Sequence, residues 1–241
     1  MTDTTFDVLM LIARPAAGKS EIIHYLKNTP LAERAARFHI GAIDEIDDFP
    51  MLWTWFEEDA LLSEMGYERL HSDAEGYFKG QHLWNLLIRR IGLEYTKRLR
   101  DYPAAPQPVT ALVEFARGTE HGGFREAFQH ITPELAARAA ILYINVSWEE
   151  SLRKNRRRYN PKRPDSILEH GLSDDKLERL YRDSDWAEVS GGQAEGRLAI
   201  AGQQVPFVVF ENADDVTTPG GAPLGQRLEE RLGRLWKLYA S

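Results

Sequence analysis

The stretch FDVLMLI-ARPAAGKS-EIIHYLK, residues 6–27, decides how the N-terminal part of the chain folds. Within residues 6–12, residues 8–12 are apolar without interruption, the pattern of a strand buried on both faces of a parallel sheet. Residues 13–20 contain the proline and glycine of a turn, and residues 21–27 have the apolar spacing of a helix. The chain is therefore predicted to begin with a strand, a tight turn and a helix.

The turn is close to the phosphate-binding pattern of Gly, four residues, then Gly-Lys-Ser/Thr, in which backbone N–H groups of the loop and the helix start point at phosphates. We expect a nucleotide to contact the whole loop, namely Ala13, Arg14, Pro15, Ala16, Ala17, Gly18, Lys19 and Ser20. Lys19 is the candidate catalytic cation, and the Ser20 hydroxyl is a candidate Mg²⁺ ligand. Ala13 replaces the first glycine of the pattern, which removes easy access to positive φ and predicts a reshaped loop.

With this strand, loop and helix, the chain resembles the P-loop NTPase superfamily, in particular its nucleoside and nucleotide (adenylate-kinase-like) kinases. The likeness in layout extends over most of the chain, whereas its specific motif is confined to residues 13–20. The resemblance implies ATP and Mg²⁺ as cofactors and a small-molecule phosphate acceptor as the partner. In such enzymes, a carboxylate at the end of a neighbouring strand orients the metal.

Composition narrows the class of protein. The chain has 241 residues, enough for a large core, and its formal charge of −7 argues against sequence-independent binding to nucleic acid. It has no cysteine, which excludes disulfides and thiolate metal sites. No apolar run is long enough to span a membrane and the first residues lack a basic secretion signal, so we expect a cytoplasmic protein without a membrane partner. The sequence gives no sign of the oligomeric state.

Apolar runs separated by helical patterns predict an α/β protein, a three-layer α/β/α sandwich with a five-stranded, mainly parallel sheet. The predicted strands are residues 6–12, 38–43, 109–115, 140–146 and 205–210. Residues 197–201 and 204–210 also have the pattern of a hairpin around Gly202.

Two intervals are longer than a crossover between parallel strands requires. We interpret residues 1–241 as a single P-loop kinase-like domain with inserted segments at 50–102 and 148–190. The first is helical and expected on the acceptor side; the second is expected to be lid-like. The first insertion is rich in aromatic residues, which either line an acceptor pocket or belong to the core: Trp53, Trp55, Phe56, Tyr77, Phe78 and Trp84.

Glu114 ends a strongly apolar predicted strand, where an unpaired charge would be costly to bury. We therefore expect Glu114 to help Ser20 hold Mg²⁺. The alternative is a solvated carboxylate at a strand end.

The acidic run after the second predicted strand contains Asp44 and Asp47. In the small-molecule kinases that the chain resembles, acids at this place lie near the acceptor hydroxyl. By this likeness, Asp44 is the candidate general base or metal-positioning group, and both aspartates are candidate substrate ligands. The run is equally well explained as the solvated start of a helix, where acids are favoured.

The densest basic cluster is residues 153–158, after the fourth predicted strand. By resemblance to the lid of adenylate-kinase-like proteins, Arg153 and Arg157 are candidate catalytic groups and Arg156 a candidate nucleotide ligand. Guanidinium groups match the charge that phosphoryl transfer spreads over oxygens. Charge runs are otherwise usually solvated faces.

Two further residues are placed by the resemblance. Arg117 follows Glu114 in a glycine-bearing turn and is similar to the arginine that nucleoside-type kinases direct at substrate or phosphate. Asn212 lies after the last predicted strand, where related proteins wrap the adenine ring, although an ordinary polar turn explains it as well.

Together these residues favour an ATP-dependent phosphotransferase acting on a nucleoside, a nucleotide or a sugar-like metabolite. A regulatory protein that binds a nucleotide with reduced turnover is the main alternative, because of Ala13 and the uncertain base. An NTP hydrolase ranks last, since the sequence shows no second switch-like motif.

Overall fold

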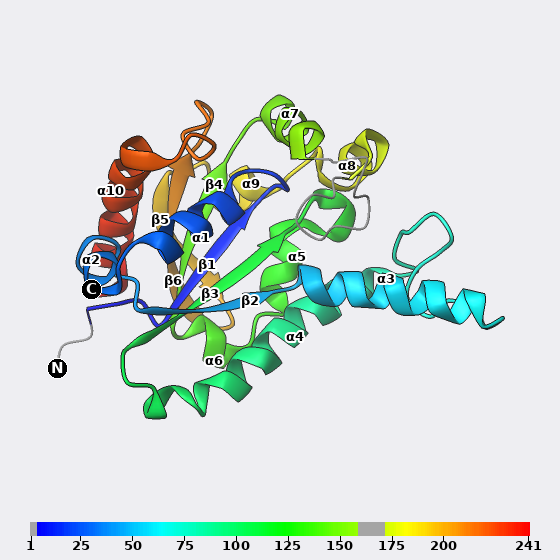
Figure 1. Cartoon of the computed structure of the whole chain (residues 1–241), viewed down its shortest axis with the longest axis horizontal. Coiled ribbons are helices and arrows are strands. Elements are labelled where there is room, and N and C mark those ends of the chain that lie inside the picture. The colour runs from blue at the N-terminus through cyan, green and yellow to red at the C-terminus, as the bar shows by residue number, and fades with distance from the viewer. Residues whose placement is uncertain (1–3, 159–171) are drawn as a thin grey trace.

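The computed structural model describes residues 4–158 and 172–241. A mixed sheet of six strands forms its centre, in the order β2-β3-β1-β4-β6-β5 (Figure 1). The strands are β1 Val8–Ala13, β2 Ala42–Asp47, β3 Val109–Ala116, β4 Ala139–Asn145, β5 Glu195–Ile200 and β6 Gln203–Glu211. Neighbours pair in parallel except at the β5–β6 edge, where pairing is antiparallel. This confirms the predicted class of a mainly parallel α/β sheet, with six strands instead of five.

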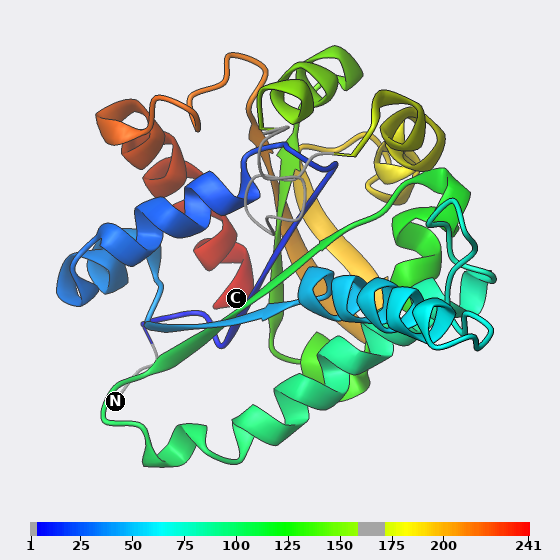
Figure 2. The same cartoon turned by 45° about the vertical axis from the view of Figure 1, so that its right-hand side comes forward.

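Helices cover both faces of the sheet and produce the predicted three layers (Figures 1 and 2). On one face lie α1 Lys19–Asn28, α2 Leu31–Phe38 and α10 Gly221–Tyr239. On the other face lie α4 Gln81–Leu99, α5 Gly123–Gln129, α6 Pro133–Ala136 and α9 Trp186–Val189. The remaining elements are α3 Phe49–Glu64, α7 Trp148–Arg158, α8 Asp174–Tyr181 and the short turns η1 Tyr102–Ala104 and η2 Thr119–His121.

Strand β1 lies in the middle of the sheet, and its side chains alternate between the two layers. Val8, Met10 and Ile12 pack with the α4 and α5 side, whereas Leu9 and Leu11 pack with α1 and α10. Because both faces are covered, the strand is apolar without interruption, as its sequence indicated.

Strand β2 lies four residues later than predicted. Phe38 ends α2 instead of starting a strand, and the left-handed His39 (φ 56°) turns the chain toward β2. At the sheet edge, the half-buried β2 tolerates its charged residues, which the sequence analysis placed after the end of the strand. The hairpin prediction is confirmed: β5 and β6 are joined through Ala201 and Gly202, both at positive φ.

The first predicted insertion, residues 50–102, is helical; it contains most of α3 and all of α4, and it ends at the first residue of η1. The second, residues 148–190, contains α7, α8 and α9, and its residues 159–171 lie outside the described part of the chain. No helix among the described residues is both long and apolar enough to cross a membrane.

Candidate active site at the carboxyl edge of the sheet

The loop after β1 has the backbone form of an anion cradle. Ala16 and Gly18 adopt positive φ (56° and 114°), so N–H groups along the turn face a common point. A Cβ atom at Gly18 would lie 2.6 Å from the Thr217 hydroxyl, which excludes larger residues. Helix α1 starts at Lys19 without a side-chain cap, and its first N–H groups are therefore left for a negatively charged ligand.

Side chains from distant parts of the chain hold this loop from outside. The Ser151 hydroxyl donates to the carbonyl of Pro15 (2.8 Å), and the Asn212 amide donates to the carbonyl of Ala17 (2.9 Å). The Arg14 guanidinium donates to carbonyls beyond β4 and after α8. Carbonyls held from outside leave the N–H groups to face inward, and the cradle is thus preorganised.

Two predicted nucleotide ligands are placed differently from expectation. Ala13 is the buried last residue of β1 and has no positive φ, because Ala16 and Gly18 make the left-handed turns. The missing glycine therefore does not deform the loop. Asn212 is fully buried and braces Ala17 and Thr217, so it supports the cradle and does not reach the cavities described below.

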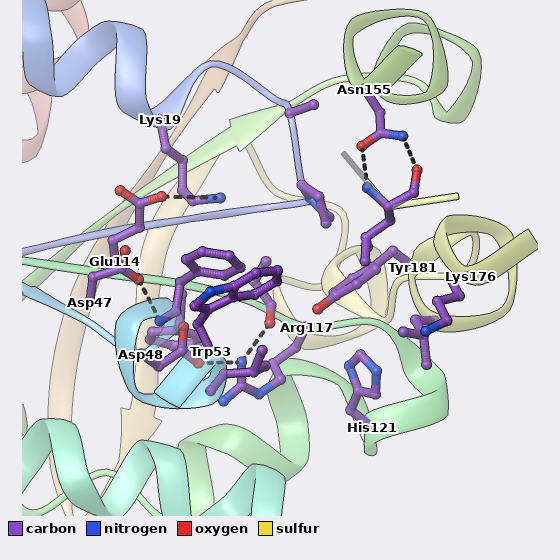
Figure 3. Close-up of a pocket in the computed structure, with 18 of the residues that line it drawn as sticks. Lys19, Asp47, Asp48, Trp53, Glu114, Arg117, His121, Asn155, Lys176 and Tyr181 are labelled. Atoms are coloured by element: carbon purple, nitrogen blue, oxygen red, sulfur yellow. Dashed lines mark hydrogen bonds and ion pairs between the residues drawn. The ribbon is translucent and has the colours of Figure 1, made fainter. Parts of the chain in front are cut away.

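Strand β3, which pairs with β1, and strand β2, which pairs with β3, bring two carboxyl groups to Lys19 (Figure 3). The Lys19 ammonium lies 3.7 Å from a carboxylate oxygen of Glu114, at the end of β3. Asp47, the last residue of β2, pairs in register with Glu114. Ser20 opens onto the same cavity. The predicted group Lys19, Ser20 and Glu114 is therefore assembled in one place, together with Asp47.

The electrostatics of the carboxyl pair are unfavourable for two full charges. Burial, the Glu114 carboxylate and the Asp48 carboxylate raise the pKa of Asp47 to about 8. Burial also raises the pKa of Glu114, although Lys19 opposes this shift. Without a further cation, the pair holds a proton near neutral pH.

The structure places Asp44 away from the site at which the sequence analysis expected it. Its carboxylate pairs with Arg98 and accepts a hydrogen bond from the Tyr102 hydroxyl (2.9 Å), on the α4 side of β2. Asp44 does not line either cavity described below. Since side chains alternate along a strand, Asp44 and Asp47 point to opposite faces. Asp47 therefore occupies the place expected for Asp44.

A large cavity of about 1140 Å³ extends from the loop toward α3 and α8. Its far wall is aromatic and includes Trp53, Phe56, Tyr77, Phe78 and Trp84. Trp55, by contrast, stacks on His71 outside the cavity wall. A second cavity of about 640 Å³ lies on the other side of the loop, between α1, α7 and residues 217–221.

Arg117 lies in the wall of the large cavity, but its charge is already matched. The Arg117 guanidinium is 2% exposed, pairs with Asp48 at 2.7 Å and donates to the carbonyl of Trp84. Beside it, His121 stacks on the Trp84 ring, with centroids 3.7 Å apart. Burial and the Arg117 charge lower the pKa of His121 to about 3, so this imidazole is neutral.

The arginine cluster separates into groups with different surroundings. Arg156 lines the large cavity and pairs with Asp174 at 2.7 Å, whereas Arg157 lines the smaller cavity. Arg158 lines both. Arg153 lines neither, because Glu150 and Asp215 hold its guanidinium. The structure therefore does not place Arg153 at the site.

Sequence reasoning missed several residues that shape the site. Lys154 is 6% exposed and joins Glu21, Asp215 and Thr217, which fixes α7 beside the loop. Tyr181 at the end of α8 lines the large cavity. Lys154 belongs to the basic run of residues 153–158, but its burial has no signal in the sequence. Tyr181 lies in the predicted insertion 148–190 and was given no role there.

The donor set fits Mg²⁺ held partly by nucleotide and water. Among the described residues, no group of three or more His, Asp or Glu side chains forms a complete metal site. The set near Lys19 has one hydroxyl, Ser20, and two carboxyls, Asp47 and Glu114, and oxygen donors of this kind suit Mg²⁺. Mg²⁺ commonly keeps water and phosphate ligands beside one or two carboxylates.

No family model matches the chain, and no curated protein matches it. Among solved structures, the chain is similar to a shikimate kinase from Acinetobacter baumannii in complex with shikimate, at 13% identity over 78% of each chain (TM-score 0.36). It is also similar to an unliganded sugar kinase from Janibacter sp., at 11% identity over 96% of this chain and 95% of that one (TM-score 0.41). TT1252 from Thermus thermophilus is 13% identical over 98% and 99% of the two chains (TM-score 0.41).

Structural similarity at these identities and TM-scores gives no evidence about activity or substrate. The chain's own geometry, with a left-handed, glycine-bearing turn after the central strand of a mainly parallel sheet, confirms the α/β layout expected from its sequence.

Proposed function

We propose that the protein is an ATP-dependent, Mg²⁺-requiring phosphotransferase that acts on a small-molecule acceptor. One observation carries the proposal: Lys19, Glu114 and Asp47 converge in the wall of the large cavity at the carboxyl edge of the sheet, beside an anion cradle that also borders the smaller cavity. A cavity on each side of one cradle suits a reaction that joins two ligands through a phosphoryl group.

On the nucleotide side, the N–H groups of residues 16–20 bind the phosphates, and Lys19 compensates their charge. The smaller cavity, beside α7 and residues 217–221, accommodates the base and ribose. Ser20 and Glu114 would hold Mg²⁺, which, when bound, neutralises charge on the phosphate oxygens.

On the acceptor side, the aromatic wall of the large cavity binds the acceptor with its hydroxyl directed at Asp47. The Asp47 carboxylate takes the hydroxyl proton as the acceptor oxygen bonds to the γ-phosphorus, and the bond to the β–γ bridging oxygen breaks. ADP leaves with that bridging oxygen. Arg156 and Arg158 face the cavity and stabilise the charge that develops on the transferred group.

The acceptor class is narrowed by the cavity wall. Planar rings and the apolar faces of sugars both pack against aromatic side chains. The proposal therefore includes nucleosides, nucleotides and sugar-like metabolites and leaves out fully aliphatic acceptors.

A test is ADP release from ATP and Mg²⁺ with and without a panel of nucleosides, nucleotides, sugars and hydroxy acids. We expect ADP release that depends on one class of ring-bearing acceptor. Acceptor-independent release would replace the kinase by a hydrolase, and tight ATP binding without release would replace it by a nucleotide sensor. Absence of ATP binding in calorimetry would overturn the proposal altogether.

A further inference from the structure

Helix α3 is apolar on two opposite sides. Leu52, Trp53 and Phe56 face the large cavity. On the opposite side of the helix, Leu61 and Met65 are 56% and 67% exposed. Tyr67 and Leu70, in the loop that follows, extend this apolar surface into solvent. We call Leu61, Met65, Tyr67 and Leu70 the α3 patch.

A second exposed apolar surface lies on α4. Leu86 and Leu93 are 43% and 47% exposed and stand seven residues apart, on one helix face. We call them the α4 patch. Among the described residues, every exposed large hydrophobic side chain belongs to one of these two patches. Such clustering marks an interaction surface, whereas scattered single residues would not.

The two patches carry opposite charge. Glu57, Glu58 and Glu64 flank Leu61 on the same face of α3, because each lies three or four residues from it. All three glutamates are exposed, and within the described residues none forms an ion pair.

On α4, the residues that share the face of Leu86 and Leu93 are Arg89, Lys97 and Arg100. All three are exposed. Among the described residues, Arg89 and Arg100 have no ion-pair partner, and Lys97 has only Glu94 at 3.6 Å. An apolar surface bordered by unpaired acids thus exists in the same molecule as an apolar surface bordered by bases, of which Arg89 and Arg100 form no ion pair within the described residues.

We propose that two copies of this chain associate, with the α3 patch of each copy on the α4 patch of the other. Helix α4, which carries one patch, covers the sheet face opposite α2 and α10, and α3 projects away from these two helices (Figures 1 and 2). In a twofold pair, the same two surfaces meet twice, so both patches are covered at once. The opposite charges align the copies and disfavour contact between like patches.

The association also bears on the proposed site. The opposite side of α3 forms part of the cavity wall, so a partner that covers the α3 patch restrains that wall. The pairing itself does not depend on the proposed reaction, since it uses no residue assigned to catalysis or to ATP.

The test is sedimentation equilibrium of the full chain over a range of concentrations, at low and high salt. We expect a monomer–dimer equilibrium that weakens at high salt, because exposed charge pairs are screened. A monomer at every concentration, or association that salt leaves unchanged, would overturn the proposal.

Two double variants reverse one charge set each: Arg89→Glu with Arg100→Glu, and Glu57→Lys with Glu64→Lys. Each alone is expected to raise the dimer dissociation constant at least about tenfold, through like-charge contact. An equimolar mixture is expected to dimerise again, because acid then meets base at both contacts. A matched control, Lys237→Glu on α10, reverses an exposed cation far from both patches and is expected to leave dimerisation unchanged.

Variants that dimerise like the unmodified protein, or a mixture that stays monomeric, would contradict the proposed pairing. Circular dichroism and melting temperature establish that each variant is folded, and all four substituted positions are solvent-facing. The salt series on the unmodified chain decides the question even if a variant fails to fold.

Discussion

The two walls of the large cavity are built in opposite ways. On the nucleotide side, the loop of residues 14–18 is held by Ser151 and Asn212, which come from far along the sequence. On the acceptor side, α3 lies wholly within the described residues and has one buried side chain, Asp59. Asp59 accepts hydrogen bonds from the N–H groups of residues 70–72, so it anchors the next loop and not the sheet.

The difference indicates that the loop after β1 is held rigidly and that α3 is held less firmly. A phosphate cradle works only if its N–H groups are already in place, and the protein fixes it with distant partners. The acceptor wall has few buried contacts, which is typical of segments that open locally at low free-energy cost. We therefore expect the nucleotide side to tolerate little change in its key residues and the acceptor side to respond gradually.

The largest effect is expected from Lys19→Ala. Removal of the ammonium at the cradle leaves developing phosphate charge uncompensated, and phosphate transfer should fall by about 10³-fold. Steady-state rates of ADP formation measure this. The matched control is Lys27→Ala, which also lines the cavity but pairs with Glu45 and is half-exposed. An equal loss in both variants would contradict a specific role for Lys19.

The next largest effect distinguishes two aspartates of the same strand. Asp47→Asn should lower phosphate transfer by about 10²-fold, with ATP affinity kept, because the acceptor loses its base. Asp44→Asn should leave the rate within about twofold and cost about 1 kcal/mol of unfolding free energy, through its lost bonds to Arg98 and Tyr102. The reverse ranking of the two rates would restore Asp44 as the base.

A third prediction concerns stability against pH in the absence of Mg²⁺ and nucleotide. The pKa of Asp47 is raised from 3.8 to about 8, so between these values the folded protein holds a proton that the unfolded chain has lost. The free energy of unfolding should therefore fall as pH rises through this window, by on the order of 2 kcal/mol. Chemical denaturation of the protein and of Asp47→Asn, where the fall should be smaller, measures the effect. Parallel pH profiles in the two proteins would refute it.

A smaller effect is expected from Asp59→Asn on the acceptor side. The carboxylate receives several N–H groups, which lower its pKa, and the amide cannot accept all of them. Loosening of the loop should raise the acceptor KM by about tenfold while ATP affinity stays within about twofold. Separate titrations of acceptor and ATP test the division between the walls. A matching loss of ATP affinity would show that the two walls are coupled.

The smallest effect is expected from Ala13→Gly, which restores the missing glycine. Because residue 13 has no positive φ, ATP affinity should change by less than about twofold. The unfolding free energy should fall by about 1 kcal/mol, since glycine weakens a strand. A large gain in ATP affinity would mean that Ala13 does deform the loop.

The sequence predicted the position of the loop after β1 well, because the form of this loop depends on local residues. Glycine, lysine and serine at fixed spacing after an apolar strand predict the loop, and the acid that ends the next strand predicts Glu114. The cradle's outer braces were not predictable in the same way. Ser151 lies in a helix, and nothing in its local sequence indicates a bond to the carbonyl of Pro15.

The mistake at Asp44 has a definite physical origin. The sequence predicted that the second strand ends at residue 43, which made Asp44 the strand-end acid, but β2 continues to Asp47. Asp44 and the actual strand-end acid, Asp47, are three residues apart. Because side chains alternate along a strand, the two aspartates lie on opposite faces of the sheet. Charged residues on an edge strand look like the residues that follow a strand, so the sequence pattern does not locate the strand end. The end is defined by the pairing of β2 with β3, which continues to Asp47.

The acceptor side was predicted as helical and aromatic but not in detail. Trp53 and Trp55 look equivalent in the sequence, yet Trp53 lines the cavity and Trp55 stacks on His71. The ion pair of Arg117 with Asp48 likewise joins residues whose proximity depends on tertiary packing.

The central claim is most directly tested by the fate of the γ-phosphate. ATP labelled at that position is incubated with Mg²⁺, the protein and the acceptor panel, and the labelled products are separated. The account predicts label in one organic acceptor, in equal amount to the ADP formed, and its absence with Asp47→Asn. Label in inorganic phosphate whatever the acceptor, or label that remains in ATP, would contradict it.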